Sequence, residues 1–131
     1  MTISDNFVYP AAEVSKIDNL AMQLSAIPGF VLMRKAADFA YEKAIEFYPD
    51  TASIVVFCGL GNNAGDGYLF AVRALNEGKK IHVISLSSPE KLKGNALQAY
   101  QEYTNMGGQL IPWDRNLDFS ADLIIDAIFG I

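Results

Sequence analysis

The spacing of apolar side chains separates a helical first third of the chain from an alternating remainder. Between residues 10 and 48, apolar residues recur every three or four positions, which is the period of a helix with one buried face. Pro28-Gly29 is expected to divide this stretch into two helices, because proline lacks a backbone donor and disfavours helix in the residue before it. Pro49-Asp50 is expected to end the second helix.

The remainder alternates between strands and helices. Ser53 to Cys58 is a continuous apolar run rich in β-branched residues, typical of a strand buried on both faces of a parallel sheet. The later predicted elements are a helix over 66–77, a strand over 79–86, a helix that opens at Ser88-Pro89 and ends before Gly107-Gly108, and strands over 109–112 and 122–129. This order predicts an α/β fold with a Rossmann-like, doubly wound and mostly parallel sheet behind an N-terminal helical segment.

Composition excludes several classes of function. The chain has 131 residues, a formal net charge of −5 and no cluster of Lys and Arg, so nucleic acid is not an expected partner. No apolar run reaches the roughly 20 residues of a membrane helix, and the first residues do not resemble a signal peptide. The single cysteine excludes a disulfide framework, which favours a reducing, cytoplasmic location.

The segment CGLGNNAGDG, residues 58–67, joins the first apolar strand to a helix. Ligands of open α/β sheets bind at the carboxyl ends of the strands, where a helix N-terminus attracts anions. A phosphate-bearing small molecule is therefore the expected ligand. Residues 59–64 satisfy the loose G-x-G-x-x-G/A pattern, but residues 84–88 at the end of the next strand hold no acid for a ribose, which disfavours a plain NAD-binding hydride-transfer domain.

Three polar residues of this segment, Asn62, Asn63 and Asp66, are more than a turn requires. Local structure is the alternative explanation, since asparagine tolerates a left-handed turn and Asp66 could N-cap the helix. Asp126 closes the last predicted strand, whose carboxyl end should lie at the same edge of the sheet. The amide oxygen of Asn63 and the carboxylate of Asp126 together suit an alkali or alkaline-earth ion, and their spacing leaves the ion open.

These residues resemble a known family. Gly59 to Gly67 is similar to the G-x-G-N-N-G-G-D-G motif of the NAD(P)HX epimerases, the YjeF N-terminal domain family, with Ala64 in place of one glycine. Asp126 to Gly130 resembles the family's D-A-[LIV]-[FL]-G motif. Residues 27–37 are similar to its I-P-x-x-x-L-M-x-x-A-G stretch, although Ala37 replaces a glycine and Arg34-Lys35 departs from the common Glu-Asn.

The resemblance implies an isomerase that interconverts the R and S forms of hydrated NADH and NADPH. It implies that the substrate is bound by Asn62, Asn63, Ala64, Gly65 and Asp66, with Gly130 and Ile131 beginning a further substrate loop. It also implies a potassium ion (K+) held by Asn63 and Asp126. Asp66 is the candidate acid–base group, and its alternative role is to orient the substrate or the loop.

Family members continue well beyond the D-A-x-F-G motif, which implies that residues 1–131 are a partial, C-terminally incomplete domain. The last strand is then expected to lack an outer neighbour, leaving an apolar edge open to pairing. The resemblance further implies the N-terminal part of a bifunctional epimerase/dehydratase, with a fused dehydratase domain downstream, and a homodimer. A non-catalytic nucleotide-binding module and an interaction fragment remain the alternatives.

Three other residues are assigned structural roles. Cys58 is expected to be a small buried apolar residue, because the sequence places no cation beside it. His82, within a predicted strand, has no second histidine or cysteine at a metal-ligand spacing. Trp113 is expected to anchor a loop rather than cover the substrate.

Overall fold

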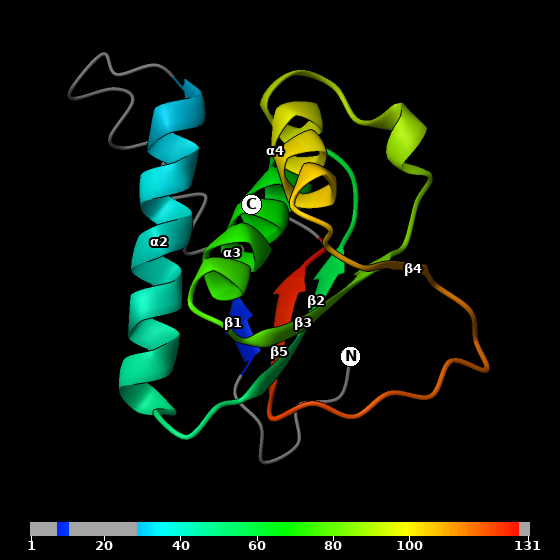
Figure 1. The fold of residues 1–131 in the computed structure, drawn as a ribbon. Coiled ribbons are helices and arrows are strands. Elements are labelled where there is room, and N and C mark those ends of the chain that lie inside the picture. The colour runs from blue at the N-terminus through cyan, green and yellow to red at the C-terminus, as the bar shows by residue number, and fades with distance from the viewer. Residues whose placement is uncertain (1–7, 11–28, 129–131) are drawn as a thin grey trace.

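The computed structural model describes residues 8–10 and 29–128 of the chain (Figure 1). These residues form five strands, three α-helices and one turn of 3-10 helix. The strands are β1 (Val8–Pro10), β2 (Ser53–Cys58), β3 (Lys80–Ser85), β4 (Leu110–Pro112) and β5 (Leu123–Ala127). The helices are α2 (Gly29–Phe47), α3 (Asn62–Asn76) and α4 (Gly94–Asn105), with the 3-10 turn at Pro89–Lys91.

All strands pair in parallel in one sheet, in the order β1-β5-β2-β3-β4. From β2 the chain moves outward through β3 to β4, and then returns to place β5 on the other side of β2. The strand order therefore reverses at β2, so the switch point lies between the carboxyl ends of β2 and β5. This arrangement confirms the predicted Rossmann-like α/β fold.

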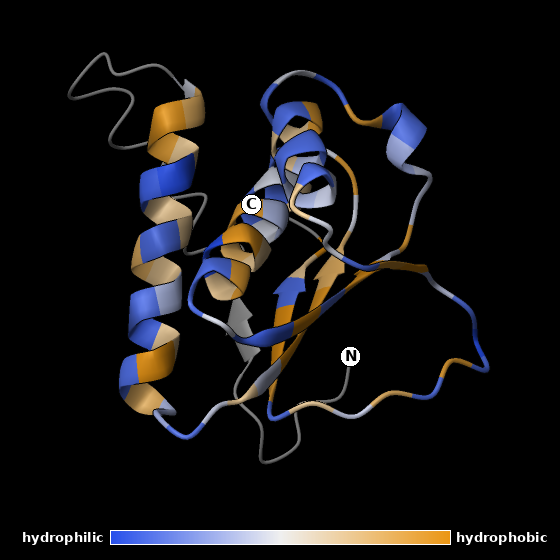
Figure 2. Ribbon diagram, viewed as in Figure 1, coloured by the Kyte–Doolittle hydropathy of each residue, from blue (hydrophilic) through white to orange (hydrophobic). Residues whose placement is uncertain are grey.

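The three helices lie on one face of the sheet, with α3 between α2 and α4 (Figure 1). Figure 2 shows that apolar residues dominate β2 and β5, while β3 mixes apolar and polar residues. The side chains that these strands direct at the helices are almost fully buried: Ile54, Val56, Cys58, Ile81, Val83, Leu123, Ile125 and Ala127. Burial of this cluster supplies the main driving force that holds helices and sheet together.

The opposite face of the sheet carries a second, smaller apolar cluster of Val55, Phe57 and Ile84. The segment that links β4 to β5 crosses this face, and its residue Leu117 packs on the cluster. The ring of Phe119 meets the ring of Phe57 edge-on, with the centroids 5.4 Å apart. None of the helices in the described part of the chain covers this face.

Two N-terminal predictions are corrected. Pro10 belongs to a strand and not to the predicted helix over 10–48, of which only α2 lies within the described residues; 11–28 lie outside them. Strand β1 pairs with β5, in register Val8↔Ile124 and Pro10↔Asp126, so the prediction that the last strand lacks an outer neighbour is wrong. Three residues are too short a stretch to show a strand period, and only tertiary pairing defines them.

Two helix boundaries also differ from prediction. Helix α3 begins at Asn62, four residues before the predicted start. Its first turn was not predicted, because Asn, Gly and Asp have low helix propensity. The helix predicted from Ser88-Pro89 is a 3-10 turn followed by α4, which starts only at Gly94. Among the described residues, no helix combines the length and hydropathy needed to cross a membrane.

Candidate functional site

The glycine-rich segment lies at the switch point of the sheet. At the end of β2, the backbone N–H of Gly59 donates to the carbonyl of Ala127 in β5 over 3.2 Å. On the other side, the N–H of Leu86, just after β3, donates to the carbonyl of Cys58 over 2.9 Å. The segment is thus fixed between two neighbouring strand ends, where open α/β sheets bind ligands.

Gly61 is the residue that turns the chain into helix α3. It is the N-cap, with φ 76° and ψ −165°, a backbone conformation that side chains rarely adopt. No side chain caps this helix end by a hydrogen bond. Asn62 is exposed and Asn63 half-buried in the first turn, at the positive end of the helix dipole. The N-terminus of α3 therefore lies at the end of β2, where a helix end favours a negative group; the phosphate-bearing ligand stays a prediction.

Gly65 and Gly67 serve packing within the protein. A Cβ at Gly67 would lie 2.6 Å from Cβ of Ala127 and 2.7 Å from Sγ of Cys58. A Cβ at Gly65 would lie 2.7 Å from Sδ of Met33 in α2 and 3.1 Å from Cα of Ala96 in α4. These two glycines therefore let α3 approach the sheet and its neighbouring helices. Substrate binding at Gly65 stays a prediction.

Asp66 lies in the second turn of α3 and is only 5 % exposed. The alternative that Asp66 caps the helix is wrong, because Gly61 occupies the cap. The Asp66 carboxylate lies close enough to Cys58, at the end of β2, to affect its thiol. Burial raises the pKa of the Cys58 thiol well above its usual range, and the charge of Asp66 raises that pKa further. Cys58 is the small buried side chain that the sequence predicts, with Sγ 3.8 Å from the carbonyl oxygen of Ala64.

Asp126 lies at the same edge of the sheet, as predicted. It is half-buried near the end of β5, and its Oδ1 accepts a hydrogen bond of 3.0 Å from the N–H of Ile128. The carbonyl oxygen of Ile128 would lie 2.5 Å from a Cβ at Gly59, so the end of β5 contacts the start of the glycine-rich segment. Gly130 and Ile131, the predicted substrate loop, lie outside the described residues.

The donor chemistry at this edge suits a hard cation. Asp126 and Asn63 both belong to the rim of the switch point and carry oxygen donors. The described part of the chain holds no group of three His, Cys, Asp or Glu side chains that could bind a metal ion. A site for K+ through Asn63 and Asp126 stays a prediction.

Three apolar side chains stand exposed beyond the carboxyl ends of neighbouring strands. Leu60 follows β2, Leu86 follows β3 and Trp113 follows β4, with 40 %, 37 % and 51 % of their surfaces exposed. The backbone N–H of Trp113, rather than its indole, attaches this loop, by donating to the carbonyl of Ser85 over 2.8 Å. The sequence alone does not indicate Leu60 and Leu86 as site residues, because their position at the rim depends on the strand order.

Comparison with known proteins identifies relatives of the chain. Residues 29–131 match the model of a family described as YjeF-related protein N-terminus. The chain is 35% identical over 135 residues to the bifunctional NAD(P)H-hydrate repair enzyme Nnr of Moorella thermoacetica, which covers 95% of the chain and 26% of that protein. It is 32% identical over 127 residues to the NAD(P)H-hydrate epimerase of Limosilactobacillus fermentum, covering 92% of the chain and 58% of that protein.

The fold is similar to one seen in a crystal structure. The chain superimposes on the yeast protein YNL200c with a TM-score of 0.67 at 20% sequence identity, covering 95% of the chain and 57% of the yeast protein. At that identity the likeness concerns the fold. The chain therefore spans between about a quarter and three fifths of the length of these relatives.

Proposed function

The chain belongs to the family of YjeF-related protein N-termini, and from this premise we propose that it is an isomerase that interconverts the R and S forms of hydrated NADH and NADPH. The observation that carries the proposal is the placement of the glycine-rich segment at the switch point of the sheet, with Asp66 buried one turn behind Asn62 and Asn63. Relatives that span similar sequence are named NAD(P)H-hydrate epimerases.

The pyrophosphate is proposed to bind at the N-terminus of α3. Gly61 leaves that helix end without a side-chain cap, and the helix dipole favours a negative group there. The hydrated nicotinamide ring then lies toward the rim, where Leu60 and Leu86 offer exposed apolar surface. Asn62 and Asn63 provide both donors and acceptors for the carboxamide and hydroxyl groups of that ring.

The reaction needs one group that gives and takes back a proton. Carbon C6 of the hydrated ring carries the hydroxyl and is bonded to the ring nitrogen. As Asp66 protonates the hydroxyl, the C6–O bond breaks, water leaves, and the nitrogen lone pair forms an iminium ion. Water then adds to the other face of C6 and returns a proton to the Asp66 carboxylate, so atoms and charge balance.

Asn63 and Asp126 are the proposed ligands of a potassium ion beside the substrate. An amide oxygen and a carboxylate fit the preference of hard cations for oxygen ligands. When bound, the ion would supply positive charge close to the substrate phosphates. The chain's own residues remain responsible for binding the ring and moving the proton.

The test is an epimerisation assay on the chain as it stands. The purified S form of hydrated NADH is incubated with the protein, and appearance of the R form is followed by chromatography against a protein-free control. Asp66→Asn is expected to lower the rate at least about 100-fold, the usual share of an acid–base group. Asp50→Asn, an exposed carboxylate at the opposite edge of the sheet, is the matched control and should leave the rate unchanged.

Binding separates the proposed function from its rivals. Asn63→Ala should weaken binding of hydrated NADH, while Asn105→Ala, at the exposed end of α4, should not. Saturable binding without any conversion by the unmodified chain would overturn the epimerase and favour a nucleotide-binding module. Absence of both binding and conversion would favour an interaction fragment.

A further inference from the structure

The proposed substrate carries a second ring, adenine, on the far side of its pyrophosphate. The nicotinamide half is assigned to Asn62, Asn63 and the apolar surface of Leu60 and Leu86, and the pyrophosphate to the N-terminus of α3. The adenosine half therefore requires a surface of its own within reach of that helix end. Such a surface needs an apolar face for the base and an acceptor for a ribose hydroxyl.

The carboxyl end of β4 offers an apolar face at Trp113, whose side chain is 51 % exposed. The backbone N–H of this residue attaches the loop, by donating to the carbonyl of Ser85 over 2.8 Å. The indole itself makes no hydrogen bond or ring contact within the described part of the chain. It is therefore open to a ligand, and an exposed indole is a stacking surface for a flat base.

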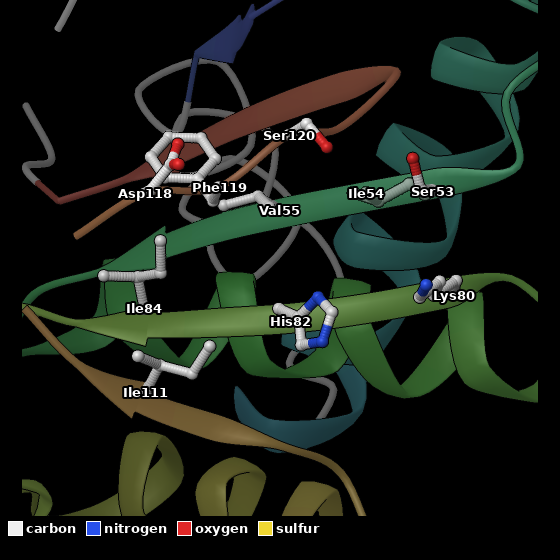
Figure 3. Close-up of a pocket in the computed structure, with 10 residues that line it drawn as sticks. All are labelled: Ser53, Ile54, Val55, Lys80, His82, Ile84, Ile111, Asp118, Phe119 and Ser120. Atoms are coloured by element: carbon white, nitrogen blue, oxygen red, sulfur yellow. The ribbon is translucent and has the colours of Figure 1, made fainter.

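Trp113 continues an apolar strip along the helix-free face of the sheet. Ile84 pairs in register with Ile111, and Figure 3 shows the two side by side near the carboxyl ends of β3 and β4. Both line a pocket of about 360 Å³ around His82. Leu86 and Trp113 come two positions after these isoleucines, the spacing at which strand residues share a face. The apolar strip thus extends to the rim of the sheet.

The turn after Trp113 supplies the carboxylate that the end of β3 lacks. The exposed Asp114 accepts a hydrogen bond of 3.1 Å at Oδ1 from the N–H of Asn116, and its carbonyl accepts one of 2.9 Å from the N–H of Leu117. Leu117 in turn packs on the apolar cluster of the helix-free face, which holds the turn against the sheet. A carboxylate has more acceptor positions than one bond uses, so Asp114 can also accept from a ribose hydroxyl.

The spacing of the strands suits a ligand that reaches from α3 to this turn. Strand β3 separates β2 from β4. Neighbouring strands lie about 4.8 Å apart, so the end of β4 is roughly 10 Å from the end of β2, where α3 begins. One ribose bridges a gap of this order between a pyrophosphate and its base. The same gap keeps the Asp114 carboxylate away from the phosphate charges.

We propose that Trp113 and Asp114 form the adenosine subsite of the proposed epimerase. The indole stacks on the adenine, and the Asp114 carboxylate accepts a hydrogen bond from the ribose 2′-hydroxyl. The inference rests on the proposed function, because it places the second half of the same substrate.

The single tryptophan of the chain makes the test direct. ADP, which carries the adenosine and the pyrophosphate without a nicotinamide, is titrated into the full chain while the fluorescence of Trp113 is followed. Stacking quenches indole emission, so ADP should lower the signal along a saturable curve, and inorganic pyrophosphate, which has no ring, should not. In calorimetry, ADP should bind at least about fivefold more tightly than pyrophosphate.

Two variants locate the contacts by calorimetry. Trp113→Leu keeps an apolar side chain but removes the ring, and should weaken ADP binding at least about fivefold. Phe39→Leu, an equal loss of an exposed ring on α2, should not change it. Asp114→Asn keeps an oxygen acceptor for the N–H of Asn116 and should weaken ADP binding about fivefold, because a charged acceptor is lost. Its effect on 2′-deoxy-ADP, which lacks the hydroxyl, should be smaller.

Three outcomes would each overturn the subsite: no saturable change of fluorescence with ADP, equal binding of ADP and pyrophosphate, or equal effects of Trp113→Leu and Phe39→Leu. The epimerisation assay separates these from failure of the proposed function. Conversion of hydrated NADH with an unchanged KM in Trp113→Leu would refute the subsite alone. Binding of ADP through Trp113 without any conversion would refute the epimerase alone.

Discussion

A substitution at Gly67 tests whether close packing of α3 on the sheet requires a glycine at this position. We predict that Gly67→Ala destabilises the chain although alanine is the better helix former. A methyl group there would meet Cβ of Ala127 at 2.6 Å, Sγ of Cys58 at 2.7 Å and Cγ1 of Val56 at 3.2 Å. Carbon atoms in contact normally lie about 3.5–4.0 Å apart, so α3 must move away from the sheet by about 1 Å.

The magnitude follows from two opposing effects. Alanine gains about 1 kcal/mol over glycine in a helix interior. Inserting a methyl group into a packed core costs about 1–3 kcal/mol, and the upper end applies because the neighbours belong to two strands that cannot rotate away. We therefore expect a net loss of about 2 kcal/mol, a sizeable part of the 5–15 kcal/mol that is usual for a whole domain.

Urea unfolding followed by circular dichroism measures this loss. Gly65→Ala is the matched variant, because its added methyl mainly meets the flexible end of Met33, and it should cost less than Gly67→Ala. In an Ala127→Gly background the nearest atom is gone, so the same change at Gly67 should cost at least about 1 kcal/mol less. Equal losses in both backgrounds, or a stabilised Gly67→Ala chain, would refute the packing explanation.

Two further predictions concern other parts of the fold. The carboxylate of Asp122 accepts hydrogen bonds from the N–H groups of Ala52 and Ser53, which lower its pKa below the ordinary 3.8. The stability that this carboxylate contributes is therefore present above about pH 4 and is lost as the pH falls through the lowered pKa. The melting temperature of Asp122→Asn should lie below that of the unmodified chain at pH 7, and the difference should shrink as the pH is lowered below 4. The buried Tyr103 donates its hydroxyl to the carbonyl of Gln109, so Tyr103→Phe should cost about 1 kcal/mol in thermal unfolding, and an unchanged stability would contradict that bond.

Local patterns were sufficient for the central elements and for the location of the site. The apolar run of β2, the period of α2 and the glycines that follow β2 identify strands, helices and the turn between them, because each depends on neighbours in sequence. The parallel polarity of the strands then places Asp126 at the same edge as the glycine-rich segment without further information. The resemblance of motifs identified the family, which the family comparison confirmed.

Other features depended on contacts between distant residues. Strand β1 is defined by its pairing with β5, and the first turn of α3 exists because Gly65 and Gly67 let the helix pack closely on the sheet despite weak local propensity. The pocket around His82 required three strands and the loop before β5 to meet on one face. The sequence alone determined the helices, the strands and the turn after β2, because these depend on the period, propensity and polarity of residues that are neighbours in the chain. Only the tertiary structure decided pairing and close approach, because their free energy comes from groups far apart in the chain.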